Sequence, residues 1–392
     1  MSDPQASAER LSAGAVDVLP KGRLAEQLAA AEREGRALRV KLGIDPTAPD
    51  IHLGHVVVLR KLRAFQDAGH LVVLIIGDYT ARVGDPSGRS AERPLVSDEQ
   101  IDANAETFSE QAFKVLDRDR TEARRNSEWL QMGSDDLFRL IRRFTVARLL
   151  ERDDFQRRMK GDEPISALEL LYPVLQGYDS VAIEADVELG GTDQKFNLLF
   201  GRDVQGALGV AEQSVMTMPI LPGTDGVRRM SKSLDNYVGV TDPPEEMFGK
   251  LMSVPDEAMA QYYELLLAEP LDTARHPMDA KRELGRRIVA WFWDAESSAA
   301  AEAHFDRVHV EHGTPEQMPE IALGEGDVHL PALIADGFGI SRSEARRLVS
   351  QGGVKIEGAA VDAERLDLPA GELDGRVLQV GKRRFARLRS GA

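Results

Sequence analysis

The sequence predicts an α/β fold with a parallel sheet, followed by a helical region and a small α+β segment. Residues 38–44 alternate apolar and basic side chains, which is typical of a strand. A helix follows, with apolar residues at helical spacing up to Gly69. Residues 71–77 are a continuous apolar run, as in a strand covered on both faces of a parallel sheet. Strand, helix and strand form a βαβ unit, which indicates a Rossmann-type nucleotide-binding sheet.

Residues 52–55, His-Leu-Gly-His, stand at the start of that helix. The two histidines are three residues apart and share one face of the first turn, where free N–H groups and the positive end of the helix dipole point outward. Gly54 leaves room for a ligand to approach the backbone, and Asp50 is the expected N-cap. The segment is therefore a candidate phosphate-binding site.

Two other interpretations of the histidine pair stay open at this point. A metal site would need a third ligand, and the chain has no cysteine. A helix N-terminus also disfavours imidazolium, so neutral hydrogen-bond donors suit this position better than cations or ligands. Alternatively, one histidine is a partly buried structural residue.

Composition excludes several classes of function. Without cysteine there are no disulfides, thiolate zinc sites or thiol nucleophiles, which is compatible with a cytosolic chain. No apolar run reaches the length of a membrane span, and residues 1–19 lack the apolar segment of a signal peptide. The net charge of −16 argues against a general nucleic-acid binder.

The charge is unevenly distributed along the chain. Residues 330–392 contain 11 Lys and Arg against 8 Asp and Glu, a local +3, so the rest of the chain carries −19. Some of these charges only solubilise the surface, but a compact basic segment on an acidic protein favours contact with a nucleic-acid backbone. The candidate RNA-binding residues are Arg342, Arg346, Arg347, Lys382, Arg383 and Arg384.

Hydrophobic patterning and turn residues place the remaining elements. In chain order we expect a loose lead-in over 2–19, helices over 23–34, 97–116, 135–159 and 165–178, a strand over 181–191, a helix from about residue 193, a strand over 215–221, helices over 243–268 and 280–308, a linker over 313–329, helices over 330–336 and after Ser341, and strands over 353–357, 376–380 and 383–388.

Three of these segments carry candidate binding residues. Residues 78–88 follow the second strand and are expected to face the same crevice as the histidine helix, although an ordinary turn is also compatible with them. Tyr172, Gln176 and Asp179 share one helix face, and Pro173 could kink that helix. Residues 222–233 hold two arginines and a lysine on a flexible loop, which suits closure on an anionic ligand as well as plain solvation.

Two segments together resemble the signature motifs of class I aminoacyl-tRNA synthetases: His-Leu-Gly-His after a strand and Arg-Met-Ser-Lys-Ser over 229–233 after the last strand of the sheet. The intervening segments are similar to bacterial tyrosyl-tRNA synthetases of the His-x-Gly-His subgroup, and residues 330–392 resemble an S4-type RNA-binding domain. The matching segments are Gly43-x-Asp45-Pro46-Thr47, residues 84–88, Tyr172 with Gln176 and Asp179, and Gly191-x-Asp193-Gln194.

This resemblance implies activation of L-tyrosine with ATP and Mg²⁺ to tyrosyl-adenylate and pyrophosphate, then transfer of tyrosine to the 3′ end of tRNA(Tyr). Positioning and positive potential suffice for such chemistry, and no covalent nucleophile is required. The resemblance also implies a cytoplasmic homodimer that uses no zinc and no membrane. Its domains would be a catalytic domain over 1–238 with a helical insertion at about 97–160, a helical domain over 239–312, a linker over 313–329 and an S4-like domain over 330–392.

The resemblance also implies roles for individual residues, with no metal ligand among them. The catalytic residues would be His52, His55, Arg229 and Lys232; the ATP site would add Asp45, Thr47, Gly54, Gly191, Asp193, Met230, Ser231 and Ser233; tyrosine would be bound by Asp85, Tyr172, Gln176, Asp179 and Gln194, with Asp179 accepting the phenol hydroxyl.

One position departs from the family pattern. The family commonly has a phenol-binding tyrosine two residues before Gly43, and this chain has Lys41 there. Two rival functions are a tryptophanyl-type synthetase and a catalytically silent RNA-binding protein. A hydroxyl acceptor such as Asp179 would be left unpaired against an indole, and the two intact signature motifs argue against a silent protein.

Overall fold

The computed structural model describes residues 3–46, 50–85, 97–310, 318–324, 326–363, 365–381 and 384–390. The chain divides into two compact units, 1–294 and 295–392, each of which is described by itself. Among the described residues, no helix combines the length and the apolar character that crossing a membrane would require.

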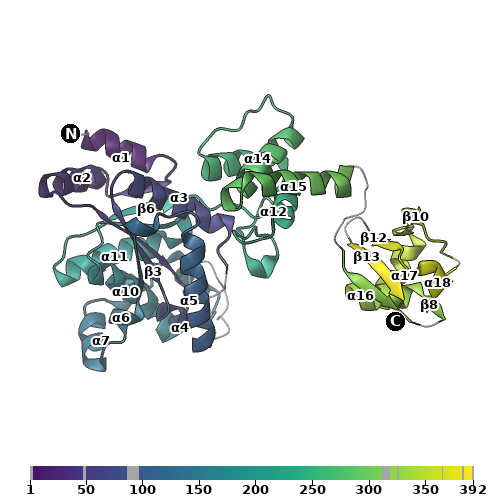
Figure 1. Cartoon of the computed structure of the whole chain (residues 1–392). Helices are drawn as coiled ribbons and strands as arrows, with labels where there is room; N and C mark the ends of the chain where they lie inside the picture. Colours follow the sequence, from purple (N-terminus) through teal and green to yellow (C-terminus); the bar gives the residue numbers. More distant parts are fainter. Residues whose placement is uncertain are drawn as a thin grey trace. The chain divides into compact units, whose positions relative to one another are not determined.

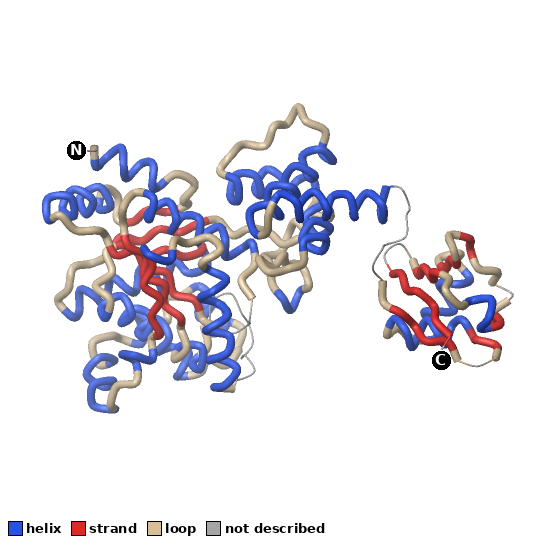
Figure 2. The backbone as a smooth tube through the Cα atoms, in the orientation of Figure 1, coloured by secondary structure: helices blue, strands red, loops and turns tan. Residues whose placement is uncertain are grey.

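The first unit is built on a six-stranded sheet in the order β1-β6-β5-β2-β3-β4. Neighbouring strands from β2 to β6 are parallel, and β1 lies antiparallel on the edge beside β6. Figure 2 shows the strands as a central layer with helices on both faces. The strands are β1 (Asp17–Leu19), β2 (Arg39–Ile44), β3 (Leu71–Ile76), β4 (Thr121–Arg125), β5 (Val187–Gly191) and β6 (Ser214–Met218).

Helices precede β1, fill the connections between these strands and follow β6 (Figure 1). They are α1 (Pro4–Ser12), α2 (Arg23–Glu34), α3 (Leu53–Asp67), α4 (Thr80–Val83), α5 (Asp98–Ala112), α6 (Ser127–Leu130), α7 (Ser134–Ile141), α8 (Val146–Leu149), α9 (Asp153–Lys160), α10 (Ala167–Ala182), α11 (Lys195–Leu208), α12 (Pro244–Met252), α13 (Met259–Tyr262) and α14 (Pro277–Phe292).

The strand order places a crevice between β2 and β5. From β2 the chain proceeds to β3 and β4 on one side, and from β5 to β6 on the other. At such a switch point the loops after the strands diverge, and ligands bind outside the carboxyl ends of the strands. The apolar run predicted as a covered strand is β3, which is buried from Val72 to Ile76. The α/β class and the parallel sheet are therefore confirmed.

Several predicted boundaries are wrong. The expected lead-in contains α1, whose N-cap Asp3 accepts a hydrogen bond from the Gln5 N–H, and edge strand β1. The N-cap of α3 is His52, not Asp50. Helix α10 passes through Pro173 without a break and continues to Ala182, so β5 begins only at Val187. The range 135–159 forms three short helices, and β4 was not predicted because it has no apolar alternation.

The second unit has its own core. A five-stranded sheet in the order β10-β9-β12-β13-β7 and a two-stranded sheet of β11 and β8 pack with two helices around residues such as Leu330, Ile334 and Leu378. The strands β7 and β8 lie within the range expected to be a linker. The elements are α15 (Ala295–Phe305), β7 (Glu320–Leu323), β8 (Asp327–His329), α16 (Leu330–Phe338), α17 (Arg342–Ser350), β9 (Val354–Ile356), β10 (Ala359–Ala360), β11 (Asp367–Pro369), α18 (Ala370–Leu373), β12 (Val377–Val380) and β13 (Arg384–Ser390).

Candidate active site

A cavity of about 600 Å³ opens at the carboxyl ends of β2, β3 and β5. Its lining residues fall into two groups. The α10 set consists of Asp45, Asp85, Tyr172, Gln176, Asp179 and Gln194; the loop set consists of Asp50, His52, His55, Arg229 and Lys232. The cavity also takes in Gly54, Gly191, Asp193, Met230 and Ser231. Residues that are far apart in the sequence are thus brought to one site.

In the α10 set, Asp45 is held between two hydroxyl donors. Tyr172 donates from its hydroxyl to Asp45 Oδ2 over 2.9 Å, and Thr80 donates to Asp45 Oδ1 over 2.7 Å. Gly77 must be a glycine because a Cβ there would lie 2.1 Å from Asp45 Oδ1. Burial and the nearby carboxylates of Asp45 and Asp85 raise the pKa of Tyr172 well above its usual value. Tyr172 is therefore a neutral hydrogen-bonding group.

Asp179 is a buried carboxylate held by two side chains from the region after β4. Trp129 Nε1 donates to its Oδ1 over 2.8 Å, and Asn126 Nδ2 lies 3.4 Å from its Oδ2. Burial raises the pKa of Asp179 to about 6, while the charge of Lys41 opposes the shift. The local sequence patterns did not predict Asn126 and Trp129 as site residues. Their one signal is their place just after β4, a strand that these patterns did not predict either.

The remaining members of the α10 set are also hydrogen-bonded within the protein. Gln194 Nε2 donates to Asp85 Oδ2 over 2.8 Å, and Asn197 donates to Gln194 Oε1 over 3.2 Å. Gln176 Nε2 donates to Glu188 Oε1 over 3.2 Å. The polar side chains of this set are thus already held in place by protein groups on strands and helices.

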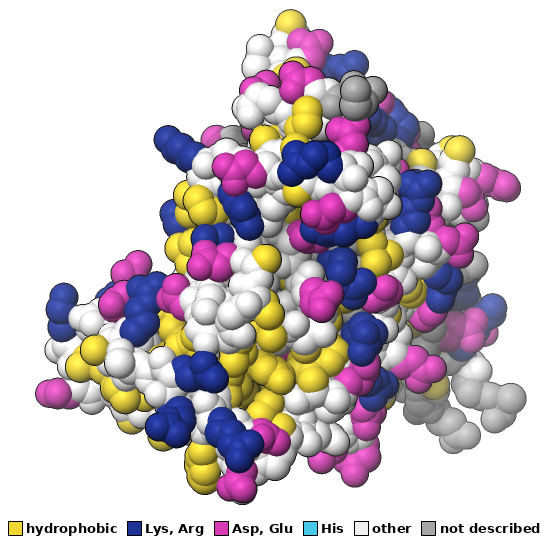
Figure 3. All heavy atoms as spheres, turned by 90° about the vertical axis from the view of Figure 1, so that its left-hand side faces the viewer, with side chains coloured by type: hydrophobic (Ala, Val, Ile, Leu, Met, Phe, Trp, Pro, Cys, Tyr) yellow, Lys and Arg dark blue, Asp and Glu magenta, His cyan; other side chains and the backbone are white. Residues whose placement is uncertain are grey.

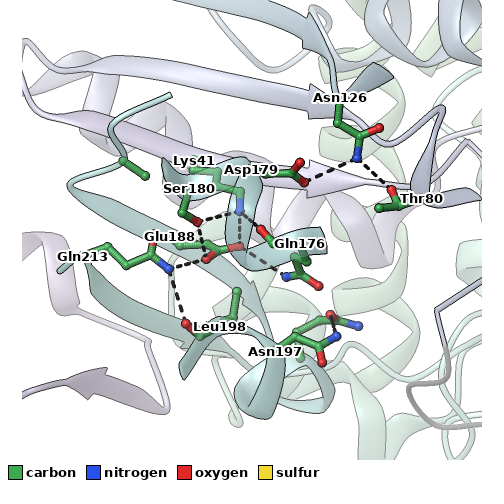
Figure 4. Close-up of polar contacts among 12 residues, drawn as sticks. Lys41, Thr80, Asn126, Gln176, Asp179, Ser180, Glu188, Asn197, Leu198 and Gln213 are labelled. Carbon is green, nitrogen blue, oxygen red and sulfur yellow. Dashed lines mark hydrogen bonds and ion pairs between the residues drawn. The ribbon is translucent and has the colours of Figure 1, made fainter. Parts of the chain in front are cut away.

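Lys41 does not face the cavity as a substitute for a phenol-binding tyrosine. Its side chain is fully buried, and its Nζ lies 2.8 Å from Glu188 Oε1 on the neighbouring strand β5. It also donates to the backbone carbonyl of Gln176 over 2.8 Å and to Ser180 Oγ over 2.7 Å (Figure 4). Lys41, the residue that departs from the family pattern, therefore fixes the Gln176–Ser180 turn of α10 to the sheet.

In the loop set, the two histidines are neutral. The His52 N–H donates to His55 Nδ1 over 3.2 Å, so the ring proton of His55 is on Nε2. Burial lowers the pKa of His52 well below its usual value, and burial together with Lys232 lowers the pKa of His55 to about 4. A Cβ on Gly54 would lie 3.0 Å from the His52 ring and 3.7 Å from Met230 Cβ. These features fit neutral donors at a helix N-terminus.

The loop after β6 brings two cations to the same cavity. Arg229 Nη1 lies 3.2 Å from Asp193 Oδ2, and Lys232 Nζ forms an ion pair with Asp50 Oδ2. The backbone of this loop is held by Asn236, whose Oδ1 accepts from the Ser231 N–H over 2.8 Å. Both cations are partly exposed and paired with carboxylates that line the cavity.

Some predicted residues lie elsewhere or outside the described part of the chain. Thr47 is not among the described residues, and nothing is described of the Ser233 side chain. In the second unit, Arg342, Arg346, Arg347 and Arg384 are exposed, while Lys382 and Arg383 are not described. Ser341 is the N-cap of α17, and its Oγ accepts from the Glu344 N–H over 3.2 Å.

Comparison with known proteins places this geometry in a family. The family model described as tRNA synthetases class I (W and Y) matches residues 33–289. A tyrosine–tRNA ligase of Moorella thermoacetica is 51% identical over 391 residues, covering 96% of this chain and 94% of the relative. One of Oleidesulfovibrio alaskensis is 49% identical, covering 96% of both. The chain belongs to the class I tyrosine–tRNA ligases.

Two further findings agree with this family. The S4 domain model matches residues 330–371, within the second unit. A mitochondrial tyrosyl-tRNA synthetase of Aspergillus nidulans matches with a TM-score of 0.62 at 21% identity, covering 77% of this chain and 93% of the other. One of Archaeoglobus fulgidus has the same TM-score at 23% identity, covering 76% and 99%. At such identities the likeness shows the fold of this ligase family alone.

Proposed function

We propose that this chain activates L-tyrosine with ATP, as its magnesium complex, and transfers the tyrosyl group to the 3′ end of tRNA(Tyr). The observation that carries the proposal is the joint lining of one cavity: it combines a buried carboxylate suited to a phenol with neutral histidine donors and two cations suited to a triphosphate.

In the activation step, a carboxylate oxygen of tyrosine attacks the α-phosphorus of ATP and the bond to pyrophosphate breaks. Negative charge develops on the phosphate oxygens, and the N–H groups of His52 and His55 at the start of α3 stabilise it. Lys232 and Arg229 leave their carboxylate partners Asp50 and Asp193 and contact the phosphates. Positioning and electrostatics perform this step without a covalent intermediate.

The tyrosine substrate is read by the α10 set. Asp179 accepts the phenol hydroxyl, and its hydrogen bond from Trp129 holds its Oδ1 while the carboxylate keeps further acceptor capacity. Asp85, Tyr172 and Gln176 surround the ammonium group, and Gln194 borders the carboxyl end. Asp45, Gly191 and Asp193 border the ribose and adenine. An indole has no phenol hydroxyl to donate to Asp179, so the remaining acceptor capacity of this carboxylate would stay unused, which disfavours tryptophan.

In the second half-reaction, a terminal hydroxyl of tRNA attacks the tyrosyl carbonyl and AMP leaves. The exposed arginines Arg342, Arg346 and Arg347 of the S4 domain contact the RNA phosphates. In this proposal, residues 1–238 with their helical insertion and residues 239–312 carry out activation, and the segment from residue 330 binds RNA.

A cytoplasmic homodimer completes the proposal. Four large apolar side chains between α7 and α10 are 47–65% exposed, an arrangement that suits burial against a second copy. Figure 3 shows hydrophobic side chains gathered on one face of the first unit among charged residues. The four exposed apolar side chains named at the start are Phe138 on α7, Val146 on α8, Met159 on α9 and Leu168 on α10. Sedimentation showing only the 43.1 kDa monomer at assay concentration would contradict the dimer.

Amino-acid-dependent ATP–pyrophosphate exchange tests the proposed function. We expect strong exchange with tyrosine alone among the twenty amino acids, dependence on magnesium, and no effect of a zinc chelator. Preference for tryptophan or dependence on zinc would overturn the assignment. No exchange with any amino acid, together with retained tRNA binding, would identify the silent RNA-binding alternative.

A further inference from the structure

A buried polar network centred on Lys41 and Glu188, neither of which lines the cavity, adjoins the α10 set through Gln176. Lys41 on β2 and Glu188 on β5 are opposite each other in the parallel ladder, and both side chains are fully buried. Figure 4 shows the network that joins them to Gln176, Ser180 and Gln213. A fully buried ion pair is a weak source of stability, so its presence next to a binding site calls for another reason.

Glu188 is saturated with hydrogen-bond donors. Its Oε1 faces Lys41 Nζ at 2.8 Å and accepts from Gln176 Nε2 over 3.2 Å. Its Oε2 accepts from Ser180 Oγ over 3.2 Å and also from Gln213 Nε2. An ionised carboxylate only accepts hydrogen bonds, so the groups that face it must be donors.

This saturation determines the orientation of the Gln176 amide. A glutamine side chain can present either its NH₂ or its oxygen to a neighbour, and Glu188 accepts only the NH₂. Gln176 Oε1 is therefore turned away from Glu188, and among the described residues it has no hydrogen-bond partner although it is buried. Gln176 lines the cavity, so this free acceptor is available to a cationic group there.

Lys41 holds the same turn of α10 from the backbone side. Its three donors go to Glu188, to Ser180 Oγ and to the carbonyl of Gln176 itself. The register of α10 on the sheet, and with it the place of Gln176 and Asp179, is thereby tied to β2 and β5. Burial raises the pKa of Asp179, and among the groups that oppose this shift the charge of Lys41 has the largest effect.

We propose that the Lys41–Glu188 pair is a positioning device for the substrate's ammonium group: it orients the Gln176 amide so that Oε1 accepts from that group. The inference rests on the proposed function, in which tyrosine occupies this cavity. It also assigns a role to Lys41, the residue that departs from the family pattern described in the sequence analysis. Lys41 and Glu188 are positioning residues, because neither is part of the cavity lining.

Two tyrosine analogues separate this role from a general loss of structure. Tyramine keeps the phenol and the ammonium group, whereas 3-(4-hydroxyphenyl)propionate keeps the phenol and the carboxylate but has no ammonium group. Dissociation constants of both are measured by calorimetry on the full-length protein. In Glu188→Gln the new amide can also donate, so the Gln176 amide is no longer held in one orientation.

For Glu188→Gln we expect tyramine to bind about tenfold more weakly, the usual loss when a hydrogen bond to a charged group is misplaced. Binding of 3-(4-hydroxyphenyl)propionate should change by less than about twofold on the same scale. The matched control is Glu169→Gln, which removes the carboxylate charge from the buried pair between Arg158 on α9 and Glu169 on α10, away from the cavity. It should leave the affinities of both analogues unchanged.

A second variant keeps the inference testable if Glu188→Gln folds poorly. In Lys41→Met/Glu188→Met both charges are replaced by apolar side chains of similar length, a change that is often neutral for stability. We expect a thermal midpoint close to that of the unmodified protein with selective loss of tyramine binding. Equal losses for both analogues, or unchanged binding in a folded variant, would overturn the positioning role.

The failure of this inference can be told apart from failure of the proposed function. If the unmodified protein does not bind tyrosine, or if Gln176→Leu leaves tyramine binding unchanged, the proposed function of the cavity is wrong. If tyrosine binds and Gln176→Leu weakens tyramine, but Glu188→Gln and the double variant do not, then only the role of the buried pair is wrong.

Discussion

The two sets of residues that line the cavity differ in how they are held. In the α10 set, Asp45, Asp179 and Gln194 receive hydrogen bonds from side chains on or next to strands and helices. In the loop set, the two cations are held by ion pairs to cavity carboxylates on partly exposed side chains. The first set is organised before any ligand arrives, and the second must exchange its partners when phosphates bind.

The energies of the two kinds of contact support this contrast. A partly exposed ion pair contributes about 0–1 kcal/mol, so a triphosphate readily displaces Asp50 from Lys232. A buried, hydrogen-bonded carboxylate such as Asp179 loses on the order of 1–3 kcal/mol when its partners are removed. In the proposed reaction, the α10 set would select the substrate, and the loop set would act on the charge that develops in the transition state.

Lys232→Ala should have the largest effect on catalysis. The rate of tyrosine activation should fall by on the order of a hundredfold or more, because a charge that acts mainly in the transition state is lost. Tyrosine binding should change little. Pre-steady-state measurement of adenylate formation gives the two values separately. Arg228→Ala is the control, since Arg228 is on the same loop but pairs with Asp225 and does not line the cavity.

Asp179→Asn should stabilise the fold at neutral pH while it damages the site. Burial raises the pKa of Asp179 in the folded state to about 6, above its ordinary value of 3.8. The carboxyl group therefore favours folding at pH values below its unfolded pKa, and this stabilisation is lost as pH rises through the folded pKa. Between about pH 5 and pH 7.5 the variant should gain on the order of 1 kcal/mol relative to the unmodified protein.

Thermal unfolding across this pH range measures the gain, and the exposed Asp119→Asn is the control. If the difference in thermal midpoint between the variant and the unmodified protein does not change with pH, burial does not raise the pKa of the Asp179 carboxyl group. The same variant should also lose discrimination between tyrosine and phenylalanine, because its amide no longer offers a charged acceptor to the phenol.

The second unit offers a contrast at the level of whole domains. Arg346→Ala/Arg347→Ala should lower tRNA charging by about tenfold and reduce the salt slope of tRNA binding by about 2, because two phosphate contacts are removed. Tyrosine-dependent pyrophosphate exchange should stay unchanged. Arg365→Ala is the control, since Arg365 belongs to the same unit but pairs with Glu372. Normal charging by the double variant would show that α17 does not contact tRNA.

The smallest effect is expected for Asp50→Asn. Removal of the carboxylate that competes for Lys232 should lower the KM for ATP by up to about fivefold, the limit for a partly exposed ion pair. Asp67→Asn at the end of α3 breaks the exposed pair with Arg63 and serves as the control. A higher KM for ATP in Asp50→Asn would show that Asp50 assists ATP binding instead of competing with it.

Local patterns in the sequence predicted the parallel sheet, because β3 is apolar throughout. They also predicted both signature segments, one of which stands at the start of α3. They did not predict β4, a polar edge strand, and so missed Asn126 and Trp129 after it. The burial of Lys41 depends on Glu188, which becomes its neighbour only because β2 and β5 are adjacent in the sheet. Such pairings arise from topology and leave no trace in local spacing.

Amide hydrogen exchange with and without a non-hydrolysable tyrosyl-adenylate analogue tests the contrast between the two sets most directly. We predict that the analogue slows exchange strongly over residues 224–236, which carry the loop cations, and changes it little over α10 (Ala167–Ala182), which is already held by β2 and β5. Strong new protection in α10 with an unchanged loop would contradict the account.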